Sequence, residues 1–338
     1  MIKISNLKIH DPSGMHKIYD QWPEFAKQAY ESKFEPITFD EIDHIVFAGM
    51  GGSGTIGDVF AAILSKTNIH VSIVKGYLLP KTVDKNTLVV ITSVSGNTSE
   101  TITILNSVVN LDCKLIVFSS GGKIESFCKN NKIPFRFIQK RHSPRASFVD
   151  YVYSILNILK NIIPINQKDI FQSILELKKL SEKISSNNLN DTNPALHLAE
   201  NITSTPLIYY PWGLQAAAIR FKNSLQENAK MHVMIEDVIE ASHNSVVSWQ
   251  LPSNVLPILL QGDDDYVKTK ERWNIMKEYF DENSINFSEI LSIKGNILSK
   301  LICLIYLLDY TTLYRAVLSQ VDPAPIPAID FIKNRLSS

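Results

Sequence analysis

Apolar residues along the first half of the chain alternate between two periodicities. Short, continuous apolar runs rich in β-branched residues begin near residues 44, 70, 87, 114 and 133, and helical spacing fills most of the stretches between them. Residues 15–30 carry apolar side chains at helical intervals before the first run, so an amphipathic helix is expected there. This alternation predicts a parallel sheet with helices on both faces.

The pattern changes between about residues 151 and 200, where helical spacing replaces the strand signal, and short apolar runs then return at 206–211, 231–235, 255–261 and 286–293. We therefore expect an α/β chain with two tandem, doubly wound, flavodoxin-like parallel-sheet domains, the second an architectural repeat of the first. The predicted boundaries are 1–155 for the first domain with its N-terminal helix, 156–200 for a helical connection, and 201–338 for the second domain with a C-terminal segment.

The most apolar stretch, residues 293–313, is interrupted at helical spacing by Lys294, Lys300 and Asp309. A buried helix is therefore expected there rather than a membrane span. Charged residues also interrupt the apolar pattern of the N-terminal segment, so no signal peptide is predicted.

Composition narrows the classes of partner. The chain has 338 residues, enough for two domains, and its 34 Lys and Arg residues balance its 34 Asp and Glu residues. A neutral chain offers no overall field to hold nucleic acid or a membrane surface, and neither partner is expected. The three cysteines, Cys113, Cys128 and Cys303, have neither metal-ligand spacing nor the even count of a disulfide framework, which favours a reduced, cytoplasmic protein.

Two predicted strands end in turns rich in glycine and hydroxyl side chains. The first turn, at 49–54, reads Gly-Met-Gly-Gly-Ser-Gly, and the second, at 93–98, reads Ser-Val-Ser-Gly-Asn-Thr. Free backbone N–H groups at a helix start, together with hydroxyls, form a site for an anion such as phosphate. Because the carboxyl ends of neighbouring parallel strands meet at one edge, the two turns predict one crevice that binds one phosphorylated small molecule.

Other interpretations of these turns stay open. The first turn matches G-x-G-x-x-G, but the acidic residue that a nicotinamide fingerprint needs about twenty positions later is missing, since the next strand leads to Lys75 and Gly76. A P-loop lacks its Gly-Lys-Ser/Thr, and a nucleophile elbow lacks its last glycine because Thr55 stands there. Each turn is also explained by a tight connection or a helix cap that binds nothing.

Together the two turns resemble those of the sugar isomerase (SIS) family of α/β domains, which bind phosphorylated sugars. An ordered series follows downstream: Arg-His-Ser-Pro-Arg-Ala-Ser-Phe at 141–148, Ser-Leu-Gln-Glu-Asn-Ala-Lys at 224–230, Glu-Ala-Ser-His-Asn at 240–244, and Asp-Pro-Ala-Pro-Ile at 322–326 with Lys333. From about residue 43 to residue 333 the chain is similar to the bifunctional phosphoglucose/phosphomannose isomerases of archaea and some bacteria.

The resemblance implies two SIS-type domains and a metal-independent aldose-ketose isomerase of carbohydrate metabolism, acting in glycolysis and gluconeogenesis. The enzyme would interconvert glucose 6-phosphate, and as a further hypothesis mannose 6-phosphate, with fructose 6-phosphate by ring opening and an enediolate proton transfer. It implies Glu227 as the proton-shuttling base, Arg145 as the cation that stabilises the enediolate, and His243 as the ring-opening acid and base. Lys333 would assist ring opening or position charge. The implied sugar and phosphate cradle comprises Gly51, Gly52, Ser53, Ser93, Ser95 and Thr98.

Without the resemblance these residues have ordinary explanations. A rotation of 100° per residue turns Glu227 away from the apolar stripe of its helix, as for a surface glutamate. His243 lies in a polar turn typical of a surface histidine, and Lys333 lies close to the chain end. The resemblance instead places His243 in the neighbouring subunit's site, which predicts a homodimer.

Two further points bear on the chemistry. Glu240 and His243 have helical metal-ligand spacing, but no second Glu-x-x-His is present, so neither a metal nor another cofactor is expected. Ala324 stands where similar sequences often have a threonine, which makes glucose 6-phosphate the safer substrate.

A non-catalytic sugar-phosphate sensor is the alternative function. Such a sensor would have no use for Glu227, and the sequence shows no basic recognition helix through which it could act on DNA.

Overall fold

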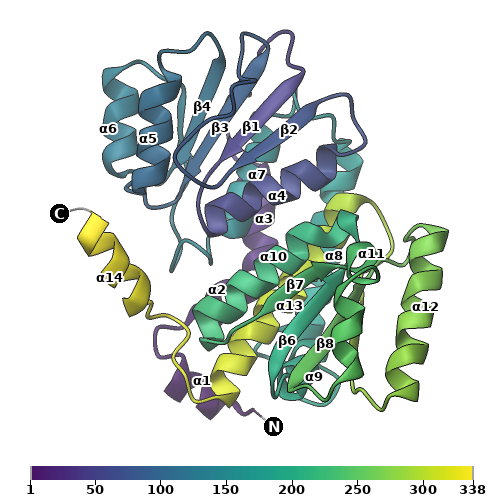
Figure 1. The fold of residues 1–338 in the computed structure, drawn as a ribbon. Helices are drawn as coiled ribbons and strands as arrows, with labels where there is room; N and C mark the ends of the chain where they lie inside the picture. The colour runs from purple at the N-terminus through teal and green to yellow at the C-terminus, as the bar shows by residue number, and fades with distance from the viewer. Residues whose placement is uncertain (1, 337–338) are drawn as a thin grey trace.

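Two parallel sheets organise the chain in a computed structural model that describes residues 2–336 (Figure 1). The first sheet has the order β2-β1-β3-β4-β5 and the second the order β7-β6-β8-β9, and every strand pair within them is parallel. The tandem, doubly wound α/β architecture expected from the apolar pattern is confirmed.

The strands lie close to the predicted runs. Their bounds are β1 (His44–Ala48), β2 (His70–Val74), β3 (Thr87–Ser93), β4 (Lys114–Ser119), β5 (Phe135–Phe137), β6 (Thr205–Tyr210), β7 (Met234–Asp237), β8 (Val255–Gln261) and β9 (Ser288–Leu291). β7 begins at Met234 rather than at the predicted residue 231. The N–H of Met231 still donates to the carbonyl oxygen of Leu225 at the end of the preceding helix.

Helices fill the intervals between the strands. Their bounds are α1 (Ile4–His10), α2 (Met15–Asp20), α3 (Trp22–Tyr30), α4 (Gly52–Leu64), α5 (Ser99–Val108), α6 (Gly122–Asn130), α7 (Phe148–Ile158), α8 (Gln167–Ile184), α9 (Pro194–Asn201), α10 (Gln215–Ser224), α11 (Val238–Ala241), α12 (Val267–Glu282), α13 (Ile297–Leu318) and α14 (Pro327–Leu336). The single helix predicted over 15–30 was wrong in detail. It is divided at Gln21, since Pro23 lacks an N–H and is tolerated only in the first turn of a new helix.

The strands of the first sheet send alternate side chains into two different layers. Ile45 and Phe47 of β1 join the core that α3, α4 and α7 cover, whereas Val46 and Ala48 pack with α5 and α6. Because both faces are covered, the strand is apolar throughout rather than alternating, as expected for a buried parallel strand.

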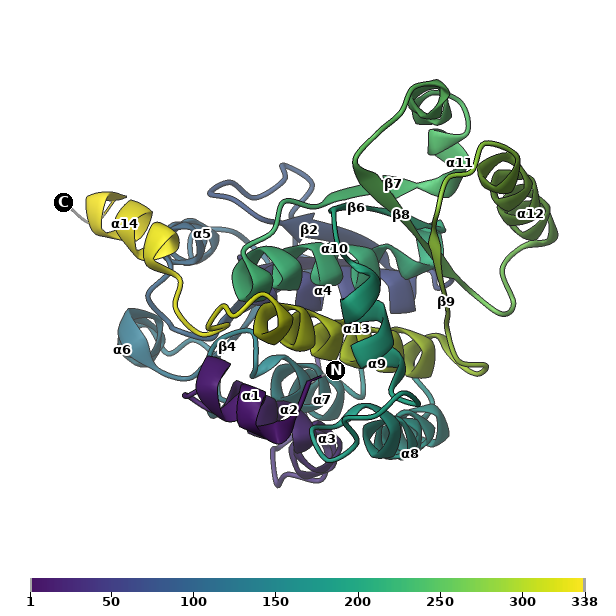
Figure 2. The same ribbon diagram turned by 90° about the horizontal axis from the view of Figure 1, so that it is seen from below.

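The second sheet repeats this arrangement. Ile208 and Tyr210 of β6 face α10 and α13, and Leu207 and Tyr209 pack with α11 and α12. The inner faces of both sheets share one continuous core with α7, α8, α9 and α13, and Figure 2 shows α4, α10 and α13 lying between the two sheets. The predicted domain boundaries of 1–155, 156–200 and 201–338 remain predictions.

The apolar stretch that was expected to be a buried helix is α13. The helix is long and apolar enough to cross a membrane by those criteria alone, but 83% of its apolar window is buried inside the protein, as in the core helix of a folded domain. Asp309, one of the charges that interrupt it, is fully buried and therefore needs a partner.

Candidate active site

The first glycine-rich turn connects β1 to α4. Gly51 has φ of +53°, which favours glycine, and α4 begins at Gly52. Ser53 is buried in the first turn of α4, and its Oγ accepts a hydrogen bond of 3.4 Å from the N–H of Val94. The two predicted turns are therefore in direct contact.

The second turn brings three hydroxyl groups together at the start of α5. The Ser93 hydroxyl donates to Oγ1 of Thr98 at 3.4 Å, and the Ser95 and Thr98 hydroxyl oxygens are also 3.4 Å apart. Gly96, with φ of +66°, donates its N–H to Oγ of Ser93 at 3.2 Å. The hydroxyls and backbone donors thus converge where a helix begins, as anion binding requires.

A third turn, between β4 and α6, supports the second one and was not singled out in the sequence. A Cβ atom at Gly96 would lie 1.7 Å from the carbonyl oxygen of Gly121, so only glycine fits there. Oδ1 of Asn97 accepts a hydrogen bond of 3.0 Å from the N–H of Lys123. The hydroxyl turn is therefore held between its neighbours.

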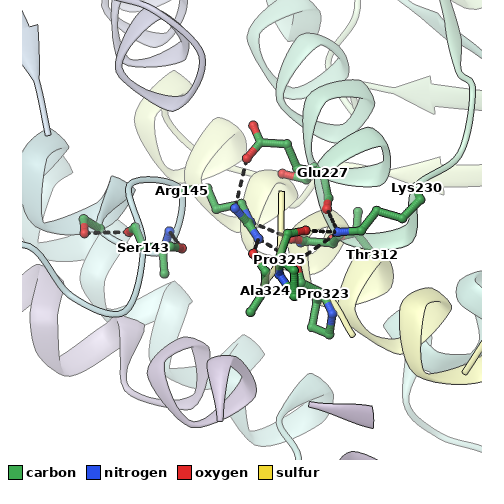
Figure 3. A network of polar contacts seen from close by, with 12 residues as sticks. Ser143, Arg145, Glu227, Lys230, Thr312, Pro323, Ala324 and Pro325 are labelled. Atoms are coloured by element: carbon green, nitrogen blue, oxygen red, sulfur yellow. Dashed lines mark hydrogen bonds and ion pairs between the residues drawn. The ribbon is translucent and has the colours of Figure 1, made fainter. Parts of the chain in front are cut away.

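Arg145 and Glu227 form an ion pair at the interface of the two halves (Figure 3). Nη1 of Arg145 donates to Oε2 of Glu227 at 3.0 Å; the Arg145 side chain is 3% exposed and that of Glu227 is 23% exposed. Glu227 lies in η2 (Leu225–Ala229), a π-helical stretch, and is less exposed than an ordinary surface glutamate because Arg145 from another part of the chain contacts it.

Further contacts leave the Arg145 guanidinium little freedom. Its Nε donates to Oδ1 of Asn228 at 2.7 Å, and Nη2 donates to the carbonyl oxygens of Pro323 at 2.6 Å and Ala324 at 3.1 Å. Asn228 in turn donates to Oγ1 of Thr312 on α13 at 2.8 Å. One arginine therefore joins the loop before α7, the end of α10 and the C-terminal segment.

Gly52 connects the hydroxyl turns to this ion pair. A Cβ atom at Gly52 would lie 3.5 Å from Cα of Arg145 and 3.3 Å from Nη1 of Arg220. The absence of a side chain lets the start of α4 approach both arginines closely. The first glycine-rich turn therefore lies next to the backbone of the arginine that pairs with Glu227.

Arg220 and Asp309 form a buried pair that holds the backbone of Arg145, and neither was named as a site residue from the sequence. Nη2 of Arg220 donates to Oδ2 of Asp309 at 2.7 Å and to the carbonyl oxygen of Arg145 at 2.6 Å. Burial opposes the charge of Arg220, but the Asp309 carboxylate more than offsets it and raises the arginine pKa above its ordinary value. A signal was present in the sequence, since a charge inside an apolar helix such as α13 requires a partner.

His243 and Lys333 are both exposed and lie on elements other than those that carry the ion pair. His243 is exposed in the turn after α11, and α11 follows β7, whereas Glu227 precedes that strand. In the part of the chain that the structure describes, no hydrogen bond or ion pair joins His243 to Arg145 or Glu227. Lys333 is exposed on α14, which stands apart from both sheets (Figure 1) and has no buried residue.

Two observations concern other possible sites. Within residues 2–336, no three His, Cys, Asp or Glu side chains are grouped so that they could hold a metal ion. A cavity of about 520 Å³ lies at the opposite end of α4, between that helix, β2 and the start of α10. Its lining includes Trp212 and Gln215 but none of the residues predicted for the site.

Comparison with known proteins relates both halves of the chain to SIS domains. The SIS domain model matches residues 39–159, and the model of the bacterial phospho-glucose isomerase C-terminal SIS domain matches residues 191–336. The chain is 29% identical over 330 residues to a bifunctional phosphoglucose/phosphomannose isomerase of Caldicellulosiruptor bescii, covering 93% of this chain and 96% of the relative. The chain is thus similar over most of its length to several bifunctional phosphoglucose/phosphomannose isomerases, and SIS-domain models match both of its halves.

The proteins similar to this chain include one that is named for a second activity. A D-glucosamine-6-phosphate 4-epimerase of Sulfolobus acidocaldarius is 28% identical over 252 residues, covering 74% of this chain and 78% of the relative. A solved structure of a hypothetical protein from Thermus thermophilus superposes with a TM-score of 0.75 at 14% identity, covering 99% of this chain and 94% of that chain. That likeness shows the fold, and the family resemblance expected from the residue series is confirmed.

Proposed function

We propose that the chain is an aldose-ketose isomerase that interconverts glucose 6-phosphate and fructose 6-phosphate, with mannose 6-phosphate as a second aldose. The observation that carries this proposal is the closeness of Gly52, in the first glycine-rich turn, to the backbone of Arg145, whose side chain pairs with Glu227. The relatives' names as bifunctional phosphoglucose/phosphomannose isomerases support the same activity.

In the proposed reaction the Glu227 carboxylate moves a proton between C2 and C1 of the open-chain sugar. The Arg145 guanidinium donates to one oxygen of that carboxylate at 3.0 Å, and in the proposal its positive charge stabilises the enediolate oxygens. Because the guanidinium is also fixed by Asn228, Pro323 and Ala324, it is organised before the charge develops. The base and its electrostatic partner are thus held in one frame.

The two hydroxyl turns supply binding energy away from the reacting carbons. In the proposal Ser53, Ser93, Ser95 and Thr98, with the N–H groups of Gly51 and Gly52, hold the phosphate and the sugar. Binding of a remote phosphate can be used to orient the carbons that react.

The test is the formation of fructose 6-phosphate from glucose 6-phosphate and, separately, from mannose 6-phosphate, each with and without EDTA. Turnover of both sugars that resists the chelator is the expected result for a metal-independent isomerase. The epimerase relative makes glucosamine 6-phosphate a necessary third sugar, with its C4 epimer measured as product. Binding of all three sugars without turnover would contradict the isomerase and favour the sensor.

Removing the hydroxyls of the second turn is expected to weaken sugar-phosphate binding. The double variant Ser95→Ala with Thr98→Ala removes two hydroxyls, each contributing about 0.5–1.5 kcal/mol if it binds the ligand, so Kd should rise about 5-fold to 150-fold. Calorimetric titration with fructose 6-phosphate measures it. Ser107→Ala, at the exposed end of α5, is the matched control, and an unchanged Kd in the double variant would place the cradle elsewhere.

A homodimer is proposed because one chain leaves His243 away from Glu227. The two residues lie on opposite sides of β7 in sequence, and Figures 1 and 2 both show α11 away from the end of α10. A histidine that opens the sugar ring must reach the substrate within hydrogen-bond distance. We propose that His243 enters the site of a second subunit.

Mixed dimers test this arrangement. His243→Ala and Glu227→Gln are each expected to be inactive, but their co-refolded mixture should regain activity, because a mixed dimer contains one site with both residues intact. Separate refolding of each variant before mixing at low temperature is the control for subunit exchange. A mixture of co-refolded chains that stays inactive would show that His243 acts within its own subunit or not at all.

A further inference from the structure

Lys230 adopts a backbone conformation that is unusual for a lysine. It ends the π-helical stretch η2 with φ of 58° and ψ of 31°, the left-handed region in which glycine or asparagine normally ends a helix. Lys132, Ser284 and Gln320 adopt a similar φ just after other helices, so it is the contacts of its side chain that set Lys230 apart.

The ammonium group of Lys230 binds main-chain oxygens from two separate segments (Figure 3). Nζ donates to the carbonyl oxygen of Glu227, to that of Pro325 at 2.8 Å and to that of Pro323 at 3.4 Å. An ammonium has three donors, and these three carbonyl groups account for all of them. Desolvation and the neighbouring Arg145 charge lower the pKa of Lys230, while the Asp322 and Glu227 carboxylates act in the opposite direction.

Arg145 also binds the C-terminal turn that Lys230 contacts, residues 322–325. Its Nη2 shares the carbonyl oxygen of Pro323 with Lys230 and also binds that of Ala324, so two cations hold three successive carbonyl groups. The turn is closed internally by Asp322, whose Oδ1 accepts the N–H of Ala324 at 2.9 Å. Beyond it, α14 begins at Pro327.

We propose that Lys230 is a positioning residue for the reaction: it fixes the main chain of Glu227 to the turn 322–325 and so sets the base and the C-terminal segment in one frame. This inference rests on the proposed isomerase function. A lysine that only ended the helix could be replaced by glycine without loss, whereas a lysine that joins two segments could not.

The experiment compares Lys230→Gly, Lys230→Met and Lys230→Arg. Glycine keeps the left-handed backbone and protects folding, methionine keeps the apolar stem, and arginine keeps a cationic donor. We expect kcat to fall about 10-fold to 100-fold in the glycine and methionine variants, with KM little changed and partial recovery in the arginine variant, because small displacements of a catalytic group have effects of this size. Lys114→Met is the matched control, since Lys114 also donates to a carbonyl group, that of Lys85, but far from the site.

Hydrogen exchange of residues 322–336 separates this proposal from the proposed function. Faster exchange of that segment in the glycine and methionine variants, with unchanged exchange in the sheets, supports the link that Lys230 makes between Glu227 and residues 322–325, even if the wild-type protein turned over no sugar phosphate. Unchanged exchange would overturn the proposal, as would an unchanged kcat in an active protein. If kcat fell only in parallel with the melting temperature, and the arginine variant recovered neither, Lys230 would be a structural residue only.

Discussion

Replacement of Glu227 by glutamine is expected to reduce isomerase turnover about 10²-fold to 10⁴-fold, the usual contribution of a general base. Glutamine keeps an oxygen that can accept the Arg145 Nη1 donor now found at 3.0 Å from Oε2, so the geometry of the pair is preserved while the basic group is lost. The initial rate of fructose 6-phosphate formation at saturating glucose 6-phosphate measures the effect. The affinity for fructose 6-phosphate should stay near that of the wild type.

The matched control is Glu289→Gln, which removes a partly exposed carboxylate from the second sheet at its ion pair with Lys277. That substitution should leave turnover unchanged, because β9 lies at the far edge of the sheet from β7. If Glu227→Gln retained the activity of this control, another group would be the base and the Arg145–Glu227 pair would be structural.

Replacement of Asp309 by alanine is expected to destabilise the fold by about 3–5 kcal/mol, because it leaves the Arg220 charge buried and unpaired. Arg220 is 1% exposed and Asp309 is 0% exposed, and the hydroxyl of Ser224 would lose its acceptor at the same time. Urea unfolding followed by tryptophan fluorescence measures the loss as a lower midpoint. Activity should fall with stability, since Arg220 also holds the carbonyl group of Arg145.

An exposed ion pair provides the comparison. Lys268 and Glu271 are paired on the surface of α12, with side chains 69% and 51% exposed, and Glu271→Ala should cost no more than about 1 kcal/mol. A double variant with Arg220→Met and Asp309→Leu should recover much of the lost stability, because no charge is then left buried. Equal midpoints for Asp309→Ala and Glu271→Ala would show that the buried pair does not support the fold.

Most of the fold could be predicted because its signals are local. The buried strands β1 and β3 are nearly continuous runs of apolar residues, and the helices between them repeat at 3.6 residues per turn. The predicted bounds of two elements were wrong because a single residue or hydrogen bond ended or extended a helix against its apolar periodicity. Pro23 divided a helix that periodicity made continuous, and the extended helix end at Leu225 delayed the start of β7.

The candidate site was predictable only in part. The hydroxyl turns were evident because Ser93, Ser95 and Thr98 lie within six residues of one another and a helix start follows them. Glu227 was named through the family resemblance, whereas its own helical pattern pointed to the surface. Arg145, 82 positions away, partly covers this side chain, and the periodicity of one helix cannot register such a contact.

The sequence by itself determined the two parallel sheets and the anion-type turns, because strand composition, helix period and helix termini act over a few residues. Only the tertiary structure decided how the chemistry is assembled. Arg145 reaches Glu227 across 82 positions and Pro323 across 178, and Arg220 finds Asp309 across 89. Such pairs form because buried charges must meet a partner wherever the packed core brings one, and no local pattern specifies which.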